Sequence, residues 1–351
     1  INSYLLSTIW FVSCEGVGSI YHPNKIRDEV TATITCGGGE NFYNDQWLNA
    51  LSPFSSFRCV DHPNYASRRT NRTCFEDNPI FEVGYTVQEV FYDLYESCFN
   101  ERTLNAVYSK YTQRPYNAKY QTRVDRPFFV ADDVYGAAPV DSLFSPRGHK
   151  AAVQDLVGNI VNEYITEKEF LSRGHLAAKT DFAFAFGERA TFHYVNCAPQ
   201  WYGFNSGNWN TLEVDLRNYI HESGVDTIIY TGTYDVTQLF TEHGGRVDIY
   251  LYSDHNNNPV IPVPLYFYKV VYEPERKRGI AFIGINGPYY TPNEAENLFF
   301  CDNICKRSTE FHWLSWHPHN AHEGYTFCCS IPDFRNTVNH LPSFAVTSIF
   351  R

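Results

Sequence analysis

Four polar residues in the middle of the chain have the side-chain types needed to hydrolyse a phosphate ester. His175 stands in the stretch LSRGHLAAKTDF, and Asn196, Asn205 and Glu213 follow it along the chain. A neutral imidazole can take a proton from water near pH 7. An amide oxygen and a carboxylate are hard ligands of the kind that Mg²⁺ prefers, and one bound cation can stabilise a phosphate oxygen and a leaving alkoxide. The set therefore indicates hydrolysis of a phosphodiester.

The histidine motif is present twice. RGHKAA at His149 differs from RGHLAA at His175 at one position. His149 opens the stretch HKAAVQDLVGNIVNEYI, whose apolar residues recur at helical spacing. No metal-ligating residues at a suitable distance follow it directly. We therefore interpret His149 as a structural residue at the start of a helix over residues 149–165, and His175 as the chemical one.

Two strands and a helix must bring the four side chains together. His175 is expected at the end of an extended segment, and ATFHYVNCAPQ, which contains Asn196, is predicted to be a strand ended by its proline. NSGNWNTLEVDLRNYIHESG predicts a helix with Asn205 at its start, Glu213 about two turns along and Gly224 at its C-terminus. The alternative is that the two asparagines cap turns and the helix, and that His175 is a satisfied structural histidine.

The remaining patterns predict a mixed α+β fold with a largely antiparallel sheet. Strands are expected at NAVYSKYTQ, VDTIIYTGTYDV, VIPVPLYFYKVVYE and GIAFIGING. The first hundred residues carry five of the ten cysteines, which indicates a β-rich module stapled by disulfides. We therefore divide the chain into an N-terminal module, 1–95, and a second domain, 96–351.

Composition points to a secreted globular protein. Ten cysteines in a chain of this size favour a disulfide framework over zinc sites, because paired CxxC units are missing. A sequon at Asn71 agrees with a secreted glycoprotein. No apolar run reaches the length of a membrane span. The sequence contains no Met, so it is expected to be a processed or trimmed chain. The net charge of −11 excludes a generally basic surface, so nucleic acid would need a local patch and a bound cation.

Three further stretches have charged or histidine-rich character. ASRRTNRT is interpreted as a solvated loop rather than a nucleic-acid contact. EPERKRG is interpreted as a short basic turn between two strands. FHWLSWHPHNAHEG could bind a transition metal or stack bases, but its spacing matches no standard zinc motif, and we favour an aromatic surface loop near disulfides.

Residues from Leu171 to about Tyr219 resemble a known family. SRGHLAAKTDF, then ATFHYVNCAPQ, then WYGFNSGNWNTLE resemble the signature of the DNA/RNA non-specific endonucleases, which have a ββα-metal core. The resemblance extends more weakly to the strands before and after this region. The long Cys-containing N-terminal region looks most like the secreted digestive nucleases of arthropods, particularly the crustacean hepatopancreas and duplex-specific nucleases.

The resemblance implies a role for each candidate residue. His175 matches the general base, and Asn205 matches the sole direct protein ligand of Mg²⁺, with Mn²⁺ or Ca²⁺ as substitutes. Glu213 matches the carboxylate that orients metal-bound water, and Asn196 matches the asparagine that steadies the site. The family also uses an upstream arginine on the phosphate, which we assign to Arg126, with Arg123 and Arg114 as rivals. Ser172 departs from the family pattern, which has Asp before Arg-Gly-His.

The expected function is therefore that of a secreted, Mg²⁺-dependent endonuclease that cleaves DNA, preferring duplex DNA, with little sequence specificity and with 5′-phosphate products. One alternative is a broad DNA/RNA or double-stranded-RNA nuclease. The other is an inactive homologue that binds nucleic acid, for which Ser172 is the only favourable feature. Nucleic acid is the expected partner, no membrane is expected, and the sequence does not indicate an oligomeric state.

Overall fold

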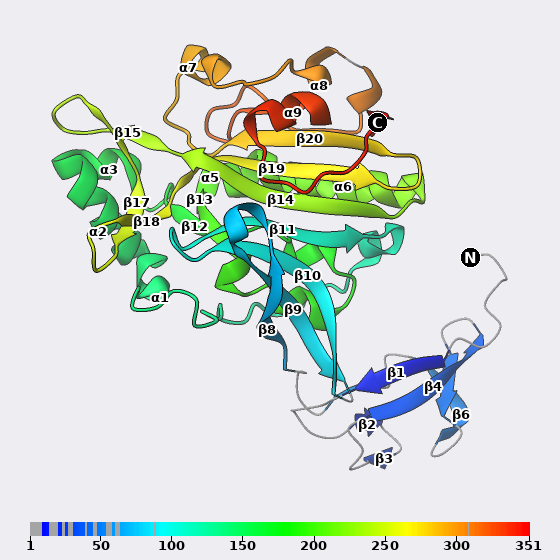
Figure 1. Ribbon diagram of the computed structural model, residues 1–351. Coiled ribbons are helices and arrows are strands. Elements are labelled where there is room, and N and C mark those ends of the chain that lie inside the picture. Colours follow the sequence, from blue (N-terminus) through cyan, green and yellow to red (C-terminus); the bar gives the residue numbers. More distant parts are fainter. Residues whose placement is uncertain are drawn as a thin grey trace. The chain divides into compact units, whose positions relative to one another are not determined.

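The computed structural model describes residues 64–87, 89–307 and 309–351, together with the strands between Ile9 and Cys59 (Figure 1). The chain divides into two compact units, one formed by 1–66 and 84–93 and the other by 67–83 and 94–351. The predicted boundary between residues 95 and 96 lies within the strand β10 (Val90–Asn100), and the division into 1–95 and 96–351 stays a prediction.

The first unit contains two small antiparallel sheets. The four-stranded sheet has the order β1-β4-β5-β6, and the three-stranded sheet has the order β3-β2-β7. The strands are β1 (Ile9–Ser13), β2 (Ile20–His22), β3 (Lys25–Ile26), β4 (Thr31–Gly38), β5 (Asn41–Asn44), β6 (Leu48–Pro53) and β7 (Arg58–Cys59). The disulfides predicted for Cys14, Cys36 and Cys59 lie outside the described side chains.

A large sheet forms the centre of the second unit, with the order β21-β20-β19-β14-β11-β10-β9-β8 and with β22 pairing with β20. Its remaining strands are β8 (Ala66–Thr73), β9 (Pro79–Val87), β11 (Asn105–Gln113), β14 (Thr227–Val236), β19 (Pro264–Glu273), β20 (Arg278–Ile285), β21 (Thr326–Cys329) and β22 (Ser348–Ile349). From β10 through β11, β14, β19 and β20 to β21 the neighbouring strands are antiparallel, whereas β22 is parallel to β20. The predicted α+β class with a largely antiparallel sheet is therefore confirmed.

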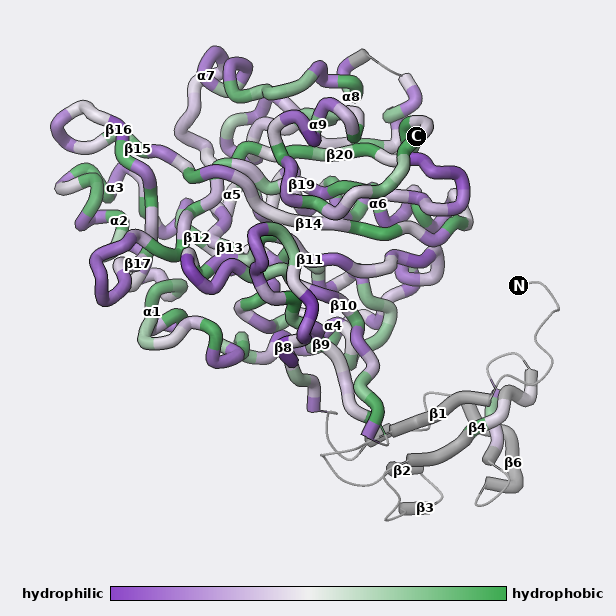
Figure 2. The backbone as a smooth tube through the Cα atoms, in the orientation of Figure 1, coloured by the Kyte–Doolittle hydropathy of each residue, from purple (hydrophilic) through white to green (hydrophobic). Residues whose placement is uncertain are grey.

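Both faces of this sheet are covered. On β19, Tyr268 packs against Phe334 of α9 (Ile331–Thr337), whereas its neighbour Phe267 packs against Phe204 and Trp209 on the other side. Successive side chains of a strand point to opposite faces, so a strand buried on both sides needs a continuous apolar run. Figure 2 shows hydrophobic colouring along much of β20 and hydrophilic colouring near the β15–β16 tip (Gln238–Phe240 and Arg246–Asp248).

A ββα unit lies on one side of the sheet. It consists of β12 (Leu171–His175), β13 (Cys197–Trp201) and a helical segment made of α5 (Tyr202–Phe204), one π-type turn (Asn205–Trp209) and α6 (Asn210–Ser223). Gly224 ends α6 in the left-handed conformation, with φ of 70°, as predicted. The predicted strand ATFHYVNCAPQ is wrong at both ends, because β13 begins at Cys197 and continues through its proline.

Two other sequence-based interpretations need correction. The helix expected over residues 149–165 is broken at Gly158, where φ is 80°, into α2 (Pro146–Val157) and α3 (Val161–Tyr164). The stretch ASRRTNRT is the strand β8 rather than a loop, and Arg68 and Arg72 form ion pairs with Glu82 of the neighbouring strand. The remaining elements of the second unit are α1 (Val140–Leu143), α4 (Ala185–Ala190), β17 (Tyr250–Ser253), β18 (Pro259–Pro262), α7 (Pro292–Asn297) and α8 (Ile304–Arg307).

Candidate active site

The β12–β13 ladder places His175 beside the start of β13. The two strands are antiparallel, and His175 lies opposite Cys197. Asn196 directly precedes Cys197, and its carbonyl accepts a hydrogen bond from the Leu176 amide at 3.0 Å. The ladder thus brings together two of the four candidate side chains that are well separated in the sequence.

Asn196 is fully buried, and all of its amide hydrogen-bonding capacity is used within the protein. Its Nδ2 donates to the carbonyls of Ala177 and Thr191, both at 3.0 Å. Its Oδ1 accepts from the Ala177 amide and from Ser109 Oγ, both at 2.8 Å. Because no amide atom remains for a ligand, Asn196 acts on the site by holding the chain that follows His175. These four hydrogen bonds of the Asn196 side chain are called the Asn196 clamp below.

Ser172 fixes the orientation of the Asn205 amide. The Ser172 hydroxyl donates to the Gln200 carbonyl across the β12–β13 ladder at 2.8 Å, and it accepts from Asn205 Nδ2 at 2.9 Å. A hydroxyl has one hydrogen, and here it is donated to the Gln200 carbonyl. The serine oxygen can then only accept from Asn205, so the amide nitrogen of Asn205 must face it. This leaves Asn205 Oδ1 available as an oxygen ligand.

Glu213 lies close to a buried ionic network and interacts electrostatically with its charges. The carboxylate of Asp181 accepts hydrogen bonds from Arg217 at 2.6 Å and from Tyr111 at 2.5 Å. Lys269, also buried, donates to Tyr111 at 3.2 Å. Burial raises the pKa of Glu213, and the charge of Asp181 raises it further, while Lys269 and Arg217 oppose the increase.

The His175 ring is held between aromatic side chains. Its centroid lies 5.0 Å from that of Phe129 and 4.8 Å from that of Phe192. Burial, reinforced by the charge of Arg126, lowers the pKa of His175 to about 3, although a hydrogen bond to the Arg173 backbone acts in the opposite direction. Nε2 has no hydrogen-bond partner among the described residues, so the bond to Arg173 comes from Nδ1–H. The imidazole is therefore neutral at pH 7, with Nε2 able to accept a proton.

One hollow of about 440 Å³ brings these groups together. His175, Asn205, Glu213 and Arg126 all line it, whereas Asn196 does not. The rival arginines also lie elsewhere: Arg123 and Arg114 do not line the hollow, and Arg114 is 3.5 Å from Asp226.

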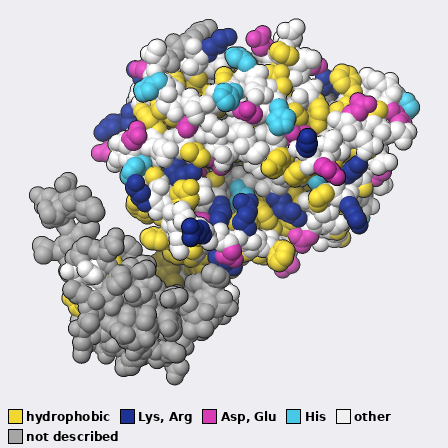
Figure 3. All heavy atoms as spheres, turned by 180° about the vertical axis from the view of Figure 1, so that it is seen from behind, with side chains coloured by type: hydrophobic (Ala, Val, Ile, Leu, Met, Phe, Trp, Pro, Cys, Tyr) yellow, Lys and Arg dark blue, Asp and Glu magenta, His cyan; other side chains and the backbone are white. Residues whose placement is uncertain are grey.

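Sequence reasoning missed two cations of this hollow, Arg173 and Lys179. Both belong to the quoted stretch LSRGHLAAKTDF, so their proximity to His175 was visible in the sequence. Despite the net charge of −11, Lys and Arg side chains gather in one area of the face seen from behind in Figure 3. Such a local group of cations is what a phosphate-binding surface requires.

The greater part of the chain matches a known protein family. The model of the DNA/RNA non-specific endonuclease family matches residues 76–334. The chain belongs to this family. It is thus a hydrolase of the endonuclease class, as the sequence motifs predict.

Relatives of this endonuclease include proteins of insect saliva. It is 26% identical to the "Salivary endonuclease" of Lutzomyia longipalpis, over 90% of this chain and 71% of the relative. It is 24% identical to "Salivary protein Tsal2A" of Glossina morsitans morsitans, over 94% of this chain and 80% of the relative. Among solved structures, a chain of the EndoG/EndoGI complex has a TM-score of 0.44 at 18% identity, covering 74% of this chain and 89% of that one.

The endonuclease family depends on a divalent metal, and the donor atoms of the hollow suit a hard cation. Among the described residues, no group of three or more His, Cys, Asp and Glu side chains is placed to hold a metal ion. A multi-ligand cage of the zinc type is therefore not found in that part of the chain. Asn205 Oδ1 and the Glu213 carboxylate instead provide few, hard oxygen donors, which fit a cation that keeps several waters, such as Mg²⁺.

The histidine-rich tail supports the helical segment of the endonuclease site. Asn208 Nδ2, in the π-type turn, donates to the carbonyls of His317 at 2.8 Å and Gly324 at 2.6 Å. His317 in turn contacts Glu323 at 2.8 Å. The segments flanking this loop are joined by the disulfides Cys301–Cys329 and Cys305–Cys328. These contacts give the loop a structural role.

Replacing Ser172 by Ala should weaken metal binding more than catalysis at saturating metal. Loss of the hydroxyl frees the Asn205 amide to rotate, and removing such a supporting partner typically costs about 10–100-fold in metal affinity. Mg²⁺ affinity should be measured by calorimetry and by the Mg²⁺ dependence of cleavage. Ser206→Ala is the matched control, because Ser206 lines the same hollow as Asn205 but its hydroxyl donates to the Tyr202 carbonyl rather than contacting the Asn205 amide. Equal affinities for the two variants would contradict this role.

Replacing Glu213 by Gln should stabilise the metal-free protein more at pH 8 than at pH 5. The pKa of Glu213 is higher in the folded state than in the unfolded state, so its contribution to stability is lost as pH rises through the folded pKa. Glutamine removes that loss. Tm in EDTA at the two pH values measures the effect, with Glu222→Gln, exposed on the same helix, as control. A variant that gains no more Tm at pH 8 than at pH 5 would show that burial does not penalise the carboxylate.

Proposed function

We propose that this endonuclease is a secreted, Mg²⁺-dependent enzyme that hydrolyses DNA, with duplex DNA ahead of single strands, little sequence specificity and 5′-phosphate products. The observation that carries the proposal is the shared hollow: His175, Asn205, Glu213 and Arg126 line one space of about 440 Å³. We propose a preference for duplex DNA because the sequence resembles those of duplex-specific nucleases.

In this proposal His175 is the general base. Its neutral imidazole accepts a proton at Nε2 from the attacking water, and the Asn196 clamp and the ring contacts keep it in place. Arg126 and Arg173 bind the phosphate and offset the charge that develops on it. Asn205 Oδ1 would hold the cation directly and Glu213 would orient the water bound to it; when bound, the cation supplies charge neutralisation at the phosphate and the leaving O3′.

Low sequence specificity follows from the kind of contact available. The cations of the hollow recognise phosphate, which carries no sequence information. Binding should accordingly weaken as salt concentration rises.

Secretion is supported by the relatives and by the cysteine chemistry. Both insect relatives are named as salivary proteins. The described residues contain the disulfides Cys74–Cys98, Cys301–Cys329 and Cys305–Cys328, and such bonds persist in oxidising compartments. Asn71 is exposed on β8, where a glycan could be attached. No helix among the described residues is long and apolar enough to cross a membrane.

The substrate preference can be tested with four nucleic acids of one sequence: duplex DNA, each DNA strand alone, and duplex RNA. Each is incubated with the wild-type protein in Mg²⁺, with Mn²⁺ and Ca²⁺ in parallel series. We expect duplex DNA to be cleaved fastest, with 5′-phosphates on the products. Equal rates on RNA would favour the alternative of a broad nuclease. Binding without cleavage of any substrate would favour the inactive homologue.

A further inference from the structure

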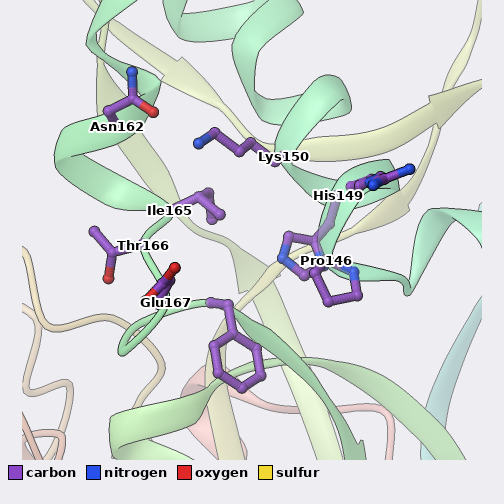
Figure 4. Close-up of a pocket in the computed structure, with 9 residues that line it drawn as sticks. Pro146, His149, Lys150, Asn162, Ile165, Thr166 and Glu167 are labelled. Carbon is purple, nitrogen blue, oxygen red and sulfur yellow. The ribbon is translucent and has the colours of Figure 1, made fainter.

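The hollow of about 440 Å³ that His175 and Asn205 line is called the catalytic hollow below. A groove continues from it along the surface of the second unit. A neighbouring hollow of about 660 Å³ shares Arg126, Arg173 and Asn205 with it. That hollow in turn shares Pro146 and Phe170 with a third, of about 620 Å³. In Figure 4 the third hollow has residues of α2 on one side and residues 162–167 on the other. If the scissile phosphate of a nucleic-acid strand lies in the catalytic hollow, the adjacent nucleotides of that strand would therefore lie in this groove.

Aromatic rings line the groove outside the catalytic hollow. Tyr202 is 43% exposed, and its ring stacks on that of Phe170 with centroids 4.8 Å apart and planes at 18°. The ring of His149, the histidine of the second RGH motif, also lies parallel to that of Phe170, with centroids 6.4 Å apart and planes at 10°. His149 is completely buried. Phe128, in the same hollow, is 96% exposed. Exposed ring faces of this kind bind planar, weakly polar groups rather than phosphate.

Within the hollow of about 660 Å³, two arginines, Arg126 and Arg173, lie where it meets the catalytic hollow, whereas Arg147, Lys150 and Glu167 line only the third hollow. Arg173 is held there by Tyr194, whose hydroxyl accepts from Nε at 2.8 Å, and its guanidinium lies 5.7 Å from the centre of the Phe129 ring. The Tyr194 hydroxyl also donates to Asp141, the carboxylate of this hollow. Arg126 and Arg173 can therefore hold a backbone phosphate at the junction of the two hollows. The adjoining aromatic part of the groove then faces the nucleobase attached to that backbone.

We propose that the groove binds an unpaired nucleobase of the strand being cleaved, with Tyr202 as its stacking surface. This assignment rests on the proposed function, because it takes the strand to be attached at the scissile phosphate. Bases inside a duplex have both faces covered by their neighbours, and unstacking one costs a few kcal/mol. The groove thus serves single-stranded substrates, and Tyr202 sets how well the enzyme cleaves them relative to duplex DNA.

The test is the ratio of kcat/KM on single-stranded DNA to that on duplex DNA of the same sequence. Base–aromatic stacking removed by alanine substitution reduces affinity by about 5- to 150-fold. Tyr202→Ala should therefore lower single-strand cleavage by about tenfold and change duplex cleavage less than about twofold. Tyr116→Ala is the matched control, because Tyr116 is also exposed, at 51%, and lines none of the three hollows. Unfolding of the variant would lower both rates equally and leave the ratio unchanged.

A strand with abasic sites separates base binding from backbone binding. Wild type and Tyr202→Ala should cleave it at the same rate, because it carries no base to stack. The assignment is overturned if Tyr202→Ala, with a duplex rate within about twofold of wild type, keeps the wild-type ratio on intact DNA, or if it slows the abasic strand as much as the intact one. Lack of cleavage of every substrate by the wild type would instead show that the proposed function is wrong.

Discussion

Replacing His175 by Ala should lower kcat on duplex DNA by about 10²–10⁴-fold, the usual contribution of a positioned general base. The residue combines a neutral ring at pH 7, a free Nε2 and a wall position in the catalytic hollow. The Asn196 clamp follows it in the chain, so the loss should come from chemistry rather than from loosening of the loop. Single-turnover rates at saturating Mg²⁺, with DNA binding measured separately, give the effect.

His149→Ala is the control for this prediction, since both histidines stand in an RGH motif. His149 is buried and does not line the catalytic hollow. Its replacement should cost stability, because it leaves a cavity, but should keep kcat per folded molecule on duplex DNA within about threefold. A variant of His149 that is inactive beside an active variant of His175 would reverse the assignment.

Replacing Asn205 by Ala should lower cleavage at low Mg²⁺ by at least about 100-fold. The variant removes the amide oxygen that the Ser172 hydrogen bond leaves available for a cation. Raising the Mg²⁺ concentration should recover part of the rate, because Glu213 can still hold a hydrated cation through its water. The Mg²⁺ dependence of the initial rate is the measurement.

Asn210→Ala provides the matched comparison, because Asn210 lines the same hollow on the following turn. It should keep the wild-type Mg²⁺ dependence. If Asn205→Ala and Asn210→Ala behave alike, Asn205 has no special role toward the metal.

Much of the fold could be predicted because apolar patterning decides it. The strands β14, β19 and β20 and the end of α6 at Gly224 all follow from local sequence. The C-terminal end of the strand β13 was predicted too early because proline normally interrupts a ladder. Pro199 is accommodated because β12 and β13 form a two-stranded sheet, in which each strand has a free edge. The β8 strand was missed because its polar, charged residues resemble a loop, and their pairing with Glu82 of the neighbouring strand has no local signature.

The candidate site could be listed from the sequence, but its internal geometry could not. The role of Ser172 depends on the register that sets it opposite Gln200 and within reach of Asn205. The clamp formed by Asn196 likewise depends on Ser109 of β11, a strand far away in the sequence. The same applies to the three buried charges near Glu213, because Asp181, Arg217 and Lys269 come from three different elements. Motif spacing indicates which residues meet, and only the fold shows which atoms remain free.

The central claim is that this chain cleaves phosphodiester bonds at the hollow of His175 and Asn205 with a divalent cation. The most direct test is to incubate wild type and His175→Ala with duplex DNA in Mg²⁺ and, in parallel, in EDTA, and to analyse the product ends. We expect 5′-phosphate fragments from the wild type in Mg²⁺ only, and at least about 100-fold slower cleavage by the variant, on the order of the contribution of a general base. Cleavage that persists in EDTA, or equal rates for the two proteins, would contradict it.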